Sequence, residues 1–425
     1  MIRTFTILGG GSAYAPGLLQ ALLRHPGALG LETVRLYDLD PARARLIARL
    51  GAGLARAAGS ALRVEAVETL EDALRGTDAI LNSTRPGGLE ARRVDETLPL
   101  DFGIPGQETV GPGGFFYALR SVPEALRAAA LRDRLAPGAW WLNYTNPSNI
   151  VSQALLDQGH TKVLGLCDQS AEDLHALGAA AGQAGDWTFA CCGLNHATWY
   201  SDLALEGRPW TPPAGLAAPA GLDAEHRLRF ELSAAMAAET PGFWPNSYLP
   251  YYRHPEAFVA LARQAPPRSE VILRALPDYY AHFEAEAAKE RPELRKHRGA
   301  SGFGDLAVAV LEALQRERPA SLVLNLPDGG ATGRFTPDTV VELPARLNRR
   351  GAEAAAVGSL PPAATELLER LEAYQRLTAQ AARLGGGARL EAALAANPLV
   401  PDAATARAML REARGRYGAL VEALA

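Results

Sequence analysis

A chain of 425 residues is long enough to bury a large core and to form about two domains. Hydrophobic residues make up 48% of it and charged residues 21%, the usual balance of a soluble globular protein. The formal net charge of -4 excludes the broad basic surface that nucleic-acid binding requires. Three cysteines are too few for a disulfide framework. With neither a signal-peptide pattern nor a long apolar run, we expect a cytoplasmic protein that does not enter a membrane.

The first half of the chain alternates between short apolar runs and helical patterns. The first run ends at Gly9, the second ends at Asp38, and a long alanine-rich helix follows Pro41. Strands alternating with helices at this spacing predict a parallel, doubly wound sheet of the Rossmann type. The predicted strands are residues 2–8, 33–37, 62–67, 78–82, 139–144 and 162–166.

The pattern changes near residue 195. Residues 187–206 alternate as antiparallel strands do, and residues 208–221 are rich in proline, glycine and alanine, which is typical of a surface loop. Helical patterns predominate from residue 223 onward, with a pair of strands near 320–343. We therefore predict an α/β protein arranged like lactate and malate dehydrogenases. A Rossmann-type domain is expected over residues 1–195 and a mostly helical α+β domain over 196–425.

A nucleotide site is indicated at the end of the first strand. Gly9-x-Gly11 lies directly between that strand and the first helix, where glycine lets a pyrophosphate approach backbone N–H groups. Tyr14 replaces the usual third glycine, so a glycine-rich turn without a nucleotide is the alternative. Asp38 ends the second strand, where a carboxylate accepts hydrogen bonds from ribose hydroxyls and disfavours a 2′-phosphate. The pattern favours NAD over NADP.

Six motifs resemble one enzyme family when they are taken in order. They are GGGSAYAP (9–16), STRPGG (83–88), DETLPLDFGIPGQETVGPGG (95–114), NYTNPSN (143–149), GLCDQS (165–170) and GLNHATW (193–199). Together they resemble glycoside hydrolase family 4, most closely its 6-phospho-β-glucosidases. The resemblance implies that NAD⁺ oxidises the sugar at C3, a base removes the C2 proton, the aglycone is eliminated, and water adds. It also implies a divalent metal, usually Mn²⁺, as Lewis acid.

The resemblance assigns the metal to Cys167 and His196. From the residues alone, one cysteine and one histidine far apart in sequence are a poor metal signature. Cys167 by itself is better explained as a buried structural cysteine, and His196 by itself is undecided. The GLC and GLNH motifs around them favour the ligand interpretation.

The catalytic base implied by the resemblance is Tyr248, in the stretch Pro245 to Tyr252. A tyrosine acts as a base only where a metal or a cation favours its phenolate. Tyr251 and Tyr252 are better interpreted as core residues. Asp168 is the expected acid for the leaving group.

The remaining site residues are expected to hold the cofactor and a phosphorylated sugar. Two converging arginines would suit a sugar phosphate because each guanidinium offers paired hydrogen bonds. The expected cofactor residues are Gly9, Gly11, Ser12, Tyr14, Asp38 and Arg85. The expected substrate residues are Arg85, Asn146, Asn195 and Arg268.

The sequence leaves alternatives for the anomer of the substrate and for the class of reaction. Family members specific for α anomers tend to have aspartate after the metal cysteine, as Asp168 is here, whereas the long segment 95–124 and the Tyr248 region resemble the β enzymes. We therefore expect a 6-phospho-β-glucosidase, with the α enzyme as the alternative. A 2-hydroxyacid dehydrogenase would accumulate NADH, and a sugar-phosphate sensor would bind without turnover. The resemblance also implies a homodimer or homotetramer.

Overall fold

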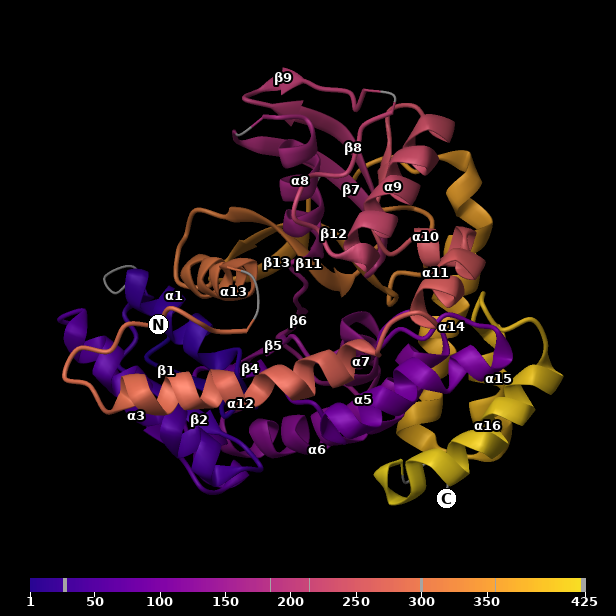
Figure 1. Cartoon of the computed structure of the whole chain (residues 1–425). Coiled ribbons are helices and arrows are strands. Elements are labelled where there is room, and N and C mark those ends of the chain that lie inside the picture. The colour runs from indigo at the N-terminus through magenta and orange to yellow at the C-terminus, as the bar shows by residue number, and fades with distance from the viewer. Residues whose placement is uncertain (26–28, 184, 214, 299–300, 356, 422–425) are drawn as a thin grey trace.

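A nine-stranded sheet forms the centre of the molecule (Figure 1). The computed structural model describes residues 1–425 except 26–28, 184, 214, 299–300, 356 and 422–425. Six strands are parallel in the order β3-β2-β1-β4-β5-β6, which is the Rossmann order. They are β1 (Thr4–Leu8), β2 (Thr33–Tyr37), β3 (Arg63–Ala66), β4 (Ala79–Asn82), β5 (Trp140–Asn143) and β6 (Val163–Gly165).

The central parallel strands form where the sequence predicts them because their residues are buried almost without a break, whereas the edge strand β3 alternates between exposed and buried residues. All four residues of β4 are buried, as expected for a strand covered on both faces. Asp40 caps the helix after β2 by accepting a hydrogen bond from the Arg43 backbone. The crossover helices are α1 (Ala15–Arg24), α3 (Pro41–Ala57), α4 (Leu70–Leu74), α5 (Gly88–Thr97), α6 (Pro112–Leu135) and α7 (Ser148–Asp157), with a 3-10 turn at Pro99–Phe102.

Three strands from the second half of the chain extend this sheet. They are β11 (Ala320–Pro327), β12 (Val340–Asn348) and β13 (Gly351–Ala354), and they are antiparallel. Asn325 of β11 pairs with Gly165 of β6, which joins the extension to the parallel strands. The sequence indicates two strands here but not the third, and it does not assign them to the first sheet.

A second, antiparallel sheet covers the other side of the site. It contains β7 (Trp187–Leu194), β8 (Ala197–Leu205), β9 (Arg208–Pro209) and β10 (Trp244–Pro245). The hairpin of β7 and β8 turns at Asn195 and His196, so the predicted division at residue 195 falls inside this turn. The division into two domains stays a prediction.

Helices make up most of the remainder (Figure 1). Helix α12 packs against α3 and α5, and α14 packs against α6, α7 and α15. None of the helices in the described part of the chain has the length and apolarity to cross a membrane. These helices are α8 (Gln169–Ala180), α9 (Ala224–Glu239), α10 (Pro250–Arg253), α11 (Pro255–Ala262), α12 (Arg268–Ala287), α13 (Ser301–Ala313), α14 (Thr365–Leu384), α15 (Gly387–Ala396) and α16 (Ala403–Tyr417), with 3-10 turns at Pro362–Ala364 and Gly418–Leu420.

Candidate active site

A cavity of about 930 Å³ opens at the carboxyl ends of the parallel strands. Its volume is near the upper end of the range of about 300 to 1,000 Å³ that is usual for ligand pockets. Five of its lining residues directly follow five of the strands: Gly9, Asp38, Ser83, Tyr144 and Leu166. This is the edge at which open α/β sheets bind their ligands.

The glycine-rich turn forms one end of the cavity. Gly9 has a φ of 84°, and its N–H donates to the Tyr37 carbonyl at 2.9 Å. The N–H of Gly11 donates to Asp38 Oδ2 at 2.9 Å, and a Cβ at Gly11 would lie 2.9 Å from that carboxylate. The turn therefore needs glycine and fixes Asp38 beside it. Burial raises the pKa of Asp38, and the hydrogen bonds from the Asp40 and Gly11 backbones oppose this.

The nucleotide fits this end of the cavity. The backbone turn leads directly into α1, whose N-terminus favours an anion, and Asp38 stands where a ribose hydroxyl would be bound. The six expected cofactor residues all line the cavity, and they are Gly9, Gly11, Ser12, Tyr14, Asp38 and Arg85.

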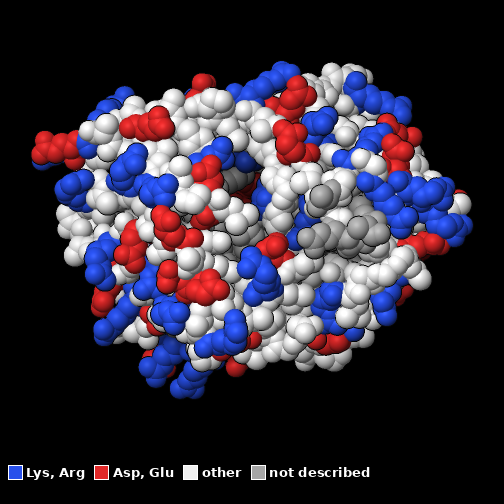
Figure 2. Space-filling view, turned by 90° about the horizontal axis from the view of Figure 1, so that it is seen from below, with Lys and Arg blue, Asp and Glu red and all other residues white. Residues whose placement is uncertain are grey.

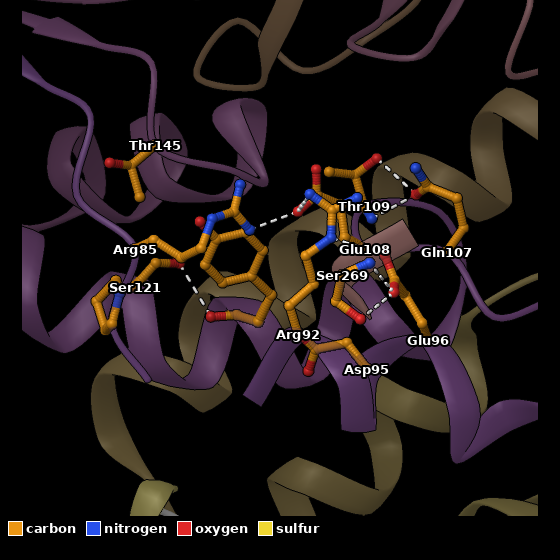
Figure 3. Close-up of polar contacts among 12 residues, drawn as sticks. Arg85, Arg92, Asp95, Glu96, Gln107, Glu108, Thr109, Ser121, Thr145 and Ser269 are labelled. Atoms are coloured by element: carbon orange, nitrogen blue, oxygen red, sulfur yellow. Dashed lines mark hydrogen bonds and ion pairs between the residues drawn. The ribbon is translucent and has the colours of Figure 1, made fainter. Parts of the chain in front are cut away.

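A buried ion-pair network supports Arg85 (Figure 3). Arg85 Nη1 lies 2.5 Å from Glu108 Oε2, and Arg92 Nη1 lies 3.0 Å from the same oxygen. Burial raises the pKa of Glu108, but the two guanidiniums outweigh it and lower that pKa to about 2. The Arg85 guanidinium also lies 5.1 Å from the centre of the Tyr117 ring. Glu108 thus holds the Arg85 side chain at the cavity wall. The sequence analysis did not assign this role to Glu108, although it belongs to the GQET part of a family motif.

Cys167 and His196 meet in the cavity, as the resemblance implies. The distance from Cys167 Sγ to His196 Nε2 is 3.6 Å. Ligand bonds of about 2.3 Å to sulfur and about 2.1 Å to nitrogen, at 90° to 109°, separate the two donors by roughly 3.1 to 3.6 Å. The pair therefore fits a first-row divalent cation. In the described part of the chain no set of three or more His, Cys, Asp or Glu could hold a metal, so the pair would need further ligands of another kind.

The hydrogen bonding and burial of His196 are suited to binding a cation. Its Nδ1 lies 2.8 Å from Thr109 Oγ1, which leaves Nε2 facing Cys167. Burial and the nearby Arg229 lower the pKa of His196 to about 3, so the imidazole is neutral, as a ligand must be. Burial and the Glu342 carboxylate raise the pKa of the Cys167 thiol well above its usual range. Burial thus disfavours the thiolate, which is the form of cysteine that binds a cation.

Tyr248 lies directly against His196. Its ring stacks on the His196 ring with centroids 4.0 Å apart and an interplanar angle of 19°. The Arg229 guanidinium lies 3.8 Å from the Tyr248 ring centre, and its Nε donates to the Ser247 carbonyl at 3.0 Å. Burial raises the pKa of Tyr248, and Arg229 opposes this rise. A cation on the ring face is the feature that a tyrosine base requires, and sequence patterns did not reveal Arg229.

Asp168 and Asn146 also line the cavity, whereas Asn195 and Arg268 do not. Burial raises the pKa of Asp168, which favours the protonated form of an acid. The Asn195 amide instead donates to Glu342 Oε2 at 2.5 Å beneath the β7–β8 turn. Arg268 is exposed at the first residue of α12. Among the described residues, the cavity therefore receives neither of these two side chains, and their substrate roles stay predictions.

Comparisons with known proteins identify the family of this chain. The family model described as "Family 4 glycosyl hydrolase" matches residues 4–175, and the model of that family's C-terminal domain matches residues 191–400. The 6-phospho-alpha-glucosidase 1 of Lacticaseibacillus paracasei is 27% identical over 96% of this chain and 96% of its own. The 6-phospho-beta-glucosidase of Escherichia coli K12 is 26% identical over 81% of this chain and 79% of its own.

Solved structures show the same fold. A 6-phospho-alpha-glucosidase from gut microorganisms, in complex with NAD and Mn²⁺, has a TM-score of 0.90 and 26% identity, covering 99% of both chains. Malate dehydrogenase from Plasmodium falciparum has a TM-score of 0.55 at 10% identity, covering 90% of this chain and 99% of its own. The predicted fold class is thereby confirmed. Because the two family models together span nearly the whole chain, the protein belongs to family 4 of the glycosyl hydrolases.

Proposed function

We propose that this protein hydrolyses 6-phosphoglucosides by redox-assisted elimination, with NAD and a divalent cation such as Mn²⁺. The observation that carries the proposal is one cavity lined by a nucleotide cradle, the Cys167–His196 pair, Tyr248, Asp168 and Arg85. The family relatives support it: the Lacticaseibacillus paracasei, Escherichia coli and gut-microorganism proteins are 6-phosphoglucosidases, and the last was solved with NAD and Mn²⁺.

The side chains of the cavity would hold the cofactor, the cation and the substrate. When bound, the nicotinamide would supply reversible oxidation at the sugar C3, and the cation would supply Lewis acidity to stabilise the negative charge that develops. Asp38 holds the adenosine ribose, and Cys167 with His196 holds the cation. Arg85, fixed by Glu108, binds the 6-phosphate through charge-assisted hydrogen bonds.

Tyr248 removes the C2 proton in this proposal. The stack on His196 holds the Tyr248 ring, so the hydroxyl can be kept at a constant position beside the Cys167–His196 pair. The Arg229 guanidinium stabilises the phenolate electrostatically, which offsets part of the burial that disfavours it. Loss of the glycosidic oxygen from C1 follows, and water adds to the resulting double bond.

Asp168 donates a proton to the leaving oxygen. It follows Cys167 directly and lines the same cavity, and burial raises its pKa, which favours the protonated form that an acid needs. An asparagine at this position could not supply that proton. This observation favours the α anomer, as do the named α relatives of Lacticaseibacillus paracasei and gut microorganisms.

The anomeric preference is therefore proposed as α, with β as the alternative. The sequence motifs over 95–124 favour β. However, Glu108 and Thr109 of this segment hold Arg85 and His196 in place, and hydrolysis of either anomer needs these two residues. Elimination through C2 does not require one configuration at C1. The aspartate is the residue whose chemistry distinguishes the two.

The test is release of p-nitrophenol from the α and β glucosides, each with and without a 6-phosphate. The assay contains NAD⁺, Mn²⁺ and a thiol, with each omitted in turn. We expect turnover of the α 6-phosphate that requires both cofactors and leaves no net NADH. Preference for the β 6-phosphate would reverse the anomeric proposal alone. Stoichiometric NADH would indicate the dehydrogenase instead, and no turnover of any of the four would contradict the proposal.

A further inference from the structure

Arg298 reaches the cavity from the segment between α12 and α13. Its N–H donates to the Ala13 carbonyl at 3.1 Å, so its backbone is fixed to the glycine-rich turn. Its guanidinium carbon lies 4.7 Å from the centre of the Tyr14 ring. The preceding His297 packs on α1 so closely that a Cβ at Gly17 would lie 2.7 Å from its Nδ1. The side chain is thus placed at the cavity wall by two contacts with the nucleotide-binding half.

The other arginines of the cavity wall are already paired with carboxylates. Arg43 pairs with Asp40 at 3.1 Å, and Arg127 pairs with Glu124 at 2.8 Å. Arg85 pairs with Glu108 at 2.5 Å. For Arg298 the described residues provide no such partner.

The charges around Arg298 leave a positive excess. Burial lowers the pKa of Arg298, and the nearby Arg85 and Arg92 lower it further, while Tyr14 and Glu108 oppose them. Arg92 also pairs with Glu96 at 2.7 Å. Three guanidiniums thus face two carboxylates, a formal excess of one positive charge. An arginine stays protonated at neutral pH, so this excess is best balanced by an anionic ligand.

We propose that Arg298 binds a phosphate group in this cavity and acts with Arg85 as the second arginine of the site. Arg85, Arg298 and Tyr14 line the same cavity, and the Arg298 guanidinium lies over the Tyr14 ring, so both arginines are available to an anion bound there. Two phosphates could reach that region: the 6-phosphate of the sugar and the pyrophosphate of the dinucleotide. Binding of the sugar 6-phosphate rests on the proposed function, whereas binding of the pyrophosphate does not.

This assignment gives Arg298 the role of second phosphate-binding arginine, which the family resemblance predicts for Arg268. Arg268 begins α12 on the exposed side, where Ser269 is tied to Glu96 by hydrogen bonds of 2.9 Å and 2.6 Å. The contact that brings Arg298 to the site is its bond to Ala13, some 285 residues away in sequence. No local pattern around Arg298 marks it for this role.

The test compares Arg298→Met with Arg295→Met, a matched change at an exposed arginine that pairs with Glu293. NAD⁺ is titrated into each protein by calorimetry, and glucose 6-phosphate is then titrated into the NAD-loaded protein. We expect Arg298→Met to weaken glucose 6-phosphate at least tenfold, with NAD⁺ changed less than threefold. A tenfold loss of NAD⁺ affinity would instead identify the pyrophosphate as the bound phosphate. Arg298→Lys should restore part of the lost affinity because it keeps the charge but not the planar fork.

Binding of both ligands equal to that of Arg295→Met would overturn the inference. Neither titration needs turnover, so the result is separate from the proposed function. A wild-type protein that binds glucose 6-phosphate through Arg298 but cleaves none of the glucosides would contradict only the proposed function. Circular dichroism of each variant checks that the fold is retained.

Discussion

Cys167 Sγ and His196 Nε2 lie 3.6 Å apart, although the two residues are separated by 29 positions in the chain. Cys167 follows the last parallel strand, β6, and His196 occupies the turn of the β7–β8 hairpin with a φ of 64°. The pair therefore forms only when the hairpin is folded back over the edge of the sheet. This relationship supports the metal role and explains why neither residue identifies a metal site from its local sequence.

Replacing the proposed thiolate ligand should remove metal-dependent activity. Serine at position 167 is a much poorer ligand for a first-row cation than a thiolate. We expect Cys167→Ser to lose more than about 100-fold in Mn²⁺ affinity, with NAD⁺ binding unchanged. Equilibrium dialysis of Mn²⁺ measures this. Cys192→Ala, a buried cysteine outside the cavity lining, is the control, and equal Mn²⁺ affinity in both variants would remove Cys167 from the site.

The hydroxyl of Thr109 should matter through His196. It lies 2.8 Å from His196 Nδ1 and donates to Gln107 Oε1 at 2.8 Å, so it accepts the imidazole N–H. Thr109→Val keeps the shape and removes this bond, and Mn²⁺ affinity should fall roughly 10- to 100-fold. Thr97→Val, at the half-buried last residue of α5 outside the cavity lining, should leave it unchanged. Unaltered Mn²⁺ binding in Thr109→Val would mean that the ring is oriented by other contacts.

Tyr248→Phe should stop proton removal at C2. Because the ring and its stack on His196 are retained, NAD⁺ and sugar binding should change less than about threefold, the scale of one lost neutral hydrogen bond. Exchange of the C2 proton of recovered substrate with deuterated solvent, followed by NMR, is the measurement. Tyr252→Phe should exchange at the normal rate. Continued exchange in Tyr248→Phe would assign the base to another group.

Asp38→Ala should weaken NAD⁺ far more than glucose 6-phosphate. The carboxylate is oriented by the Gly11 and Asp40 backbones and faces the nucleotide end of the cavity. Loss of charged hydrogen bonds to a ribose is worth about 1.5 to 3 kcal/mol, which is at least tenfold in affinity. Calorimetric titrations of both ligands measure the difference, and equal losses would contradict the ribose assignment.

Glu108 should make the stability of the protein depend on acid pH. Its pKa is lowered from 4.5 to about 2, so its contribution to the free energy of unfolding is complete above pH 4.5 and is lost as the pH falls toward 2. The contribution is on the order of 3 kcal/mol. Urea unfolding of the wild type and Glu108→Gln at pH 6 and pH 3 should show the stability gap shrinking at the lower pH. A constant gap would show that the ion pairs do not hold this carboxylate ionised.

The parallel half of the fold could be read from the sequence because its signals are local. Each strand is an apolar run that ends at a turn, and Gly9 with Asp38 marks the nucleotide end without knowledge of the rest of the chain. The extension by β11 could not be found in this way, because pairing of Asn325 with Gly165 depends on contacts between distant segments.

The site residues that belong to family motifs were predicted from the sequence. Those that reach the site only through tertiary packing were not. Cys167, His196 and Tyr248 came from the family resemblance, and the structure places all three in one cavity. Arg229 reaches the Tyr248 ring from α9, and Arg298 reaches the cavity from a loop. Neither belongs to a motif, so only the folded chain reveals them.

The most direct test of the account is hydrolysis of a 6-phosphoglucoside by the wild-type protein in deuterated water with NAD⁺ and Mn²⁺. Removal and return of the C2 proton would place deuterium at C2 of the released glucose 6-phosphate, which NMR detects. The account predicts deuterium at C2 in nearly every product molecule. Hydrolysis that leaves the original hydrogen at C2 would show direct displacement at C1 and would contradict the redox-elimination mechanism.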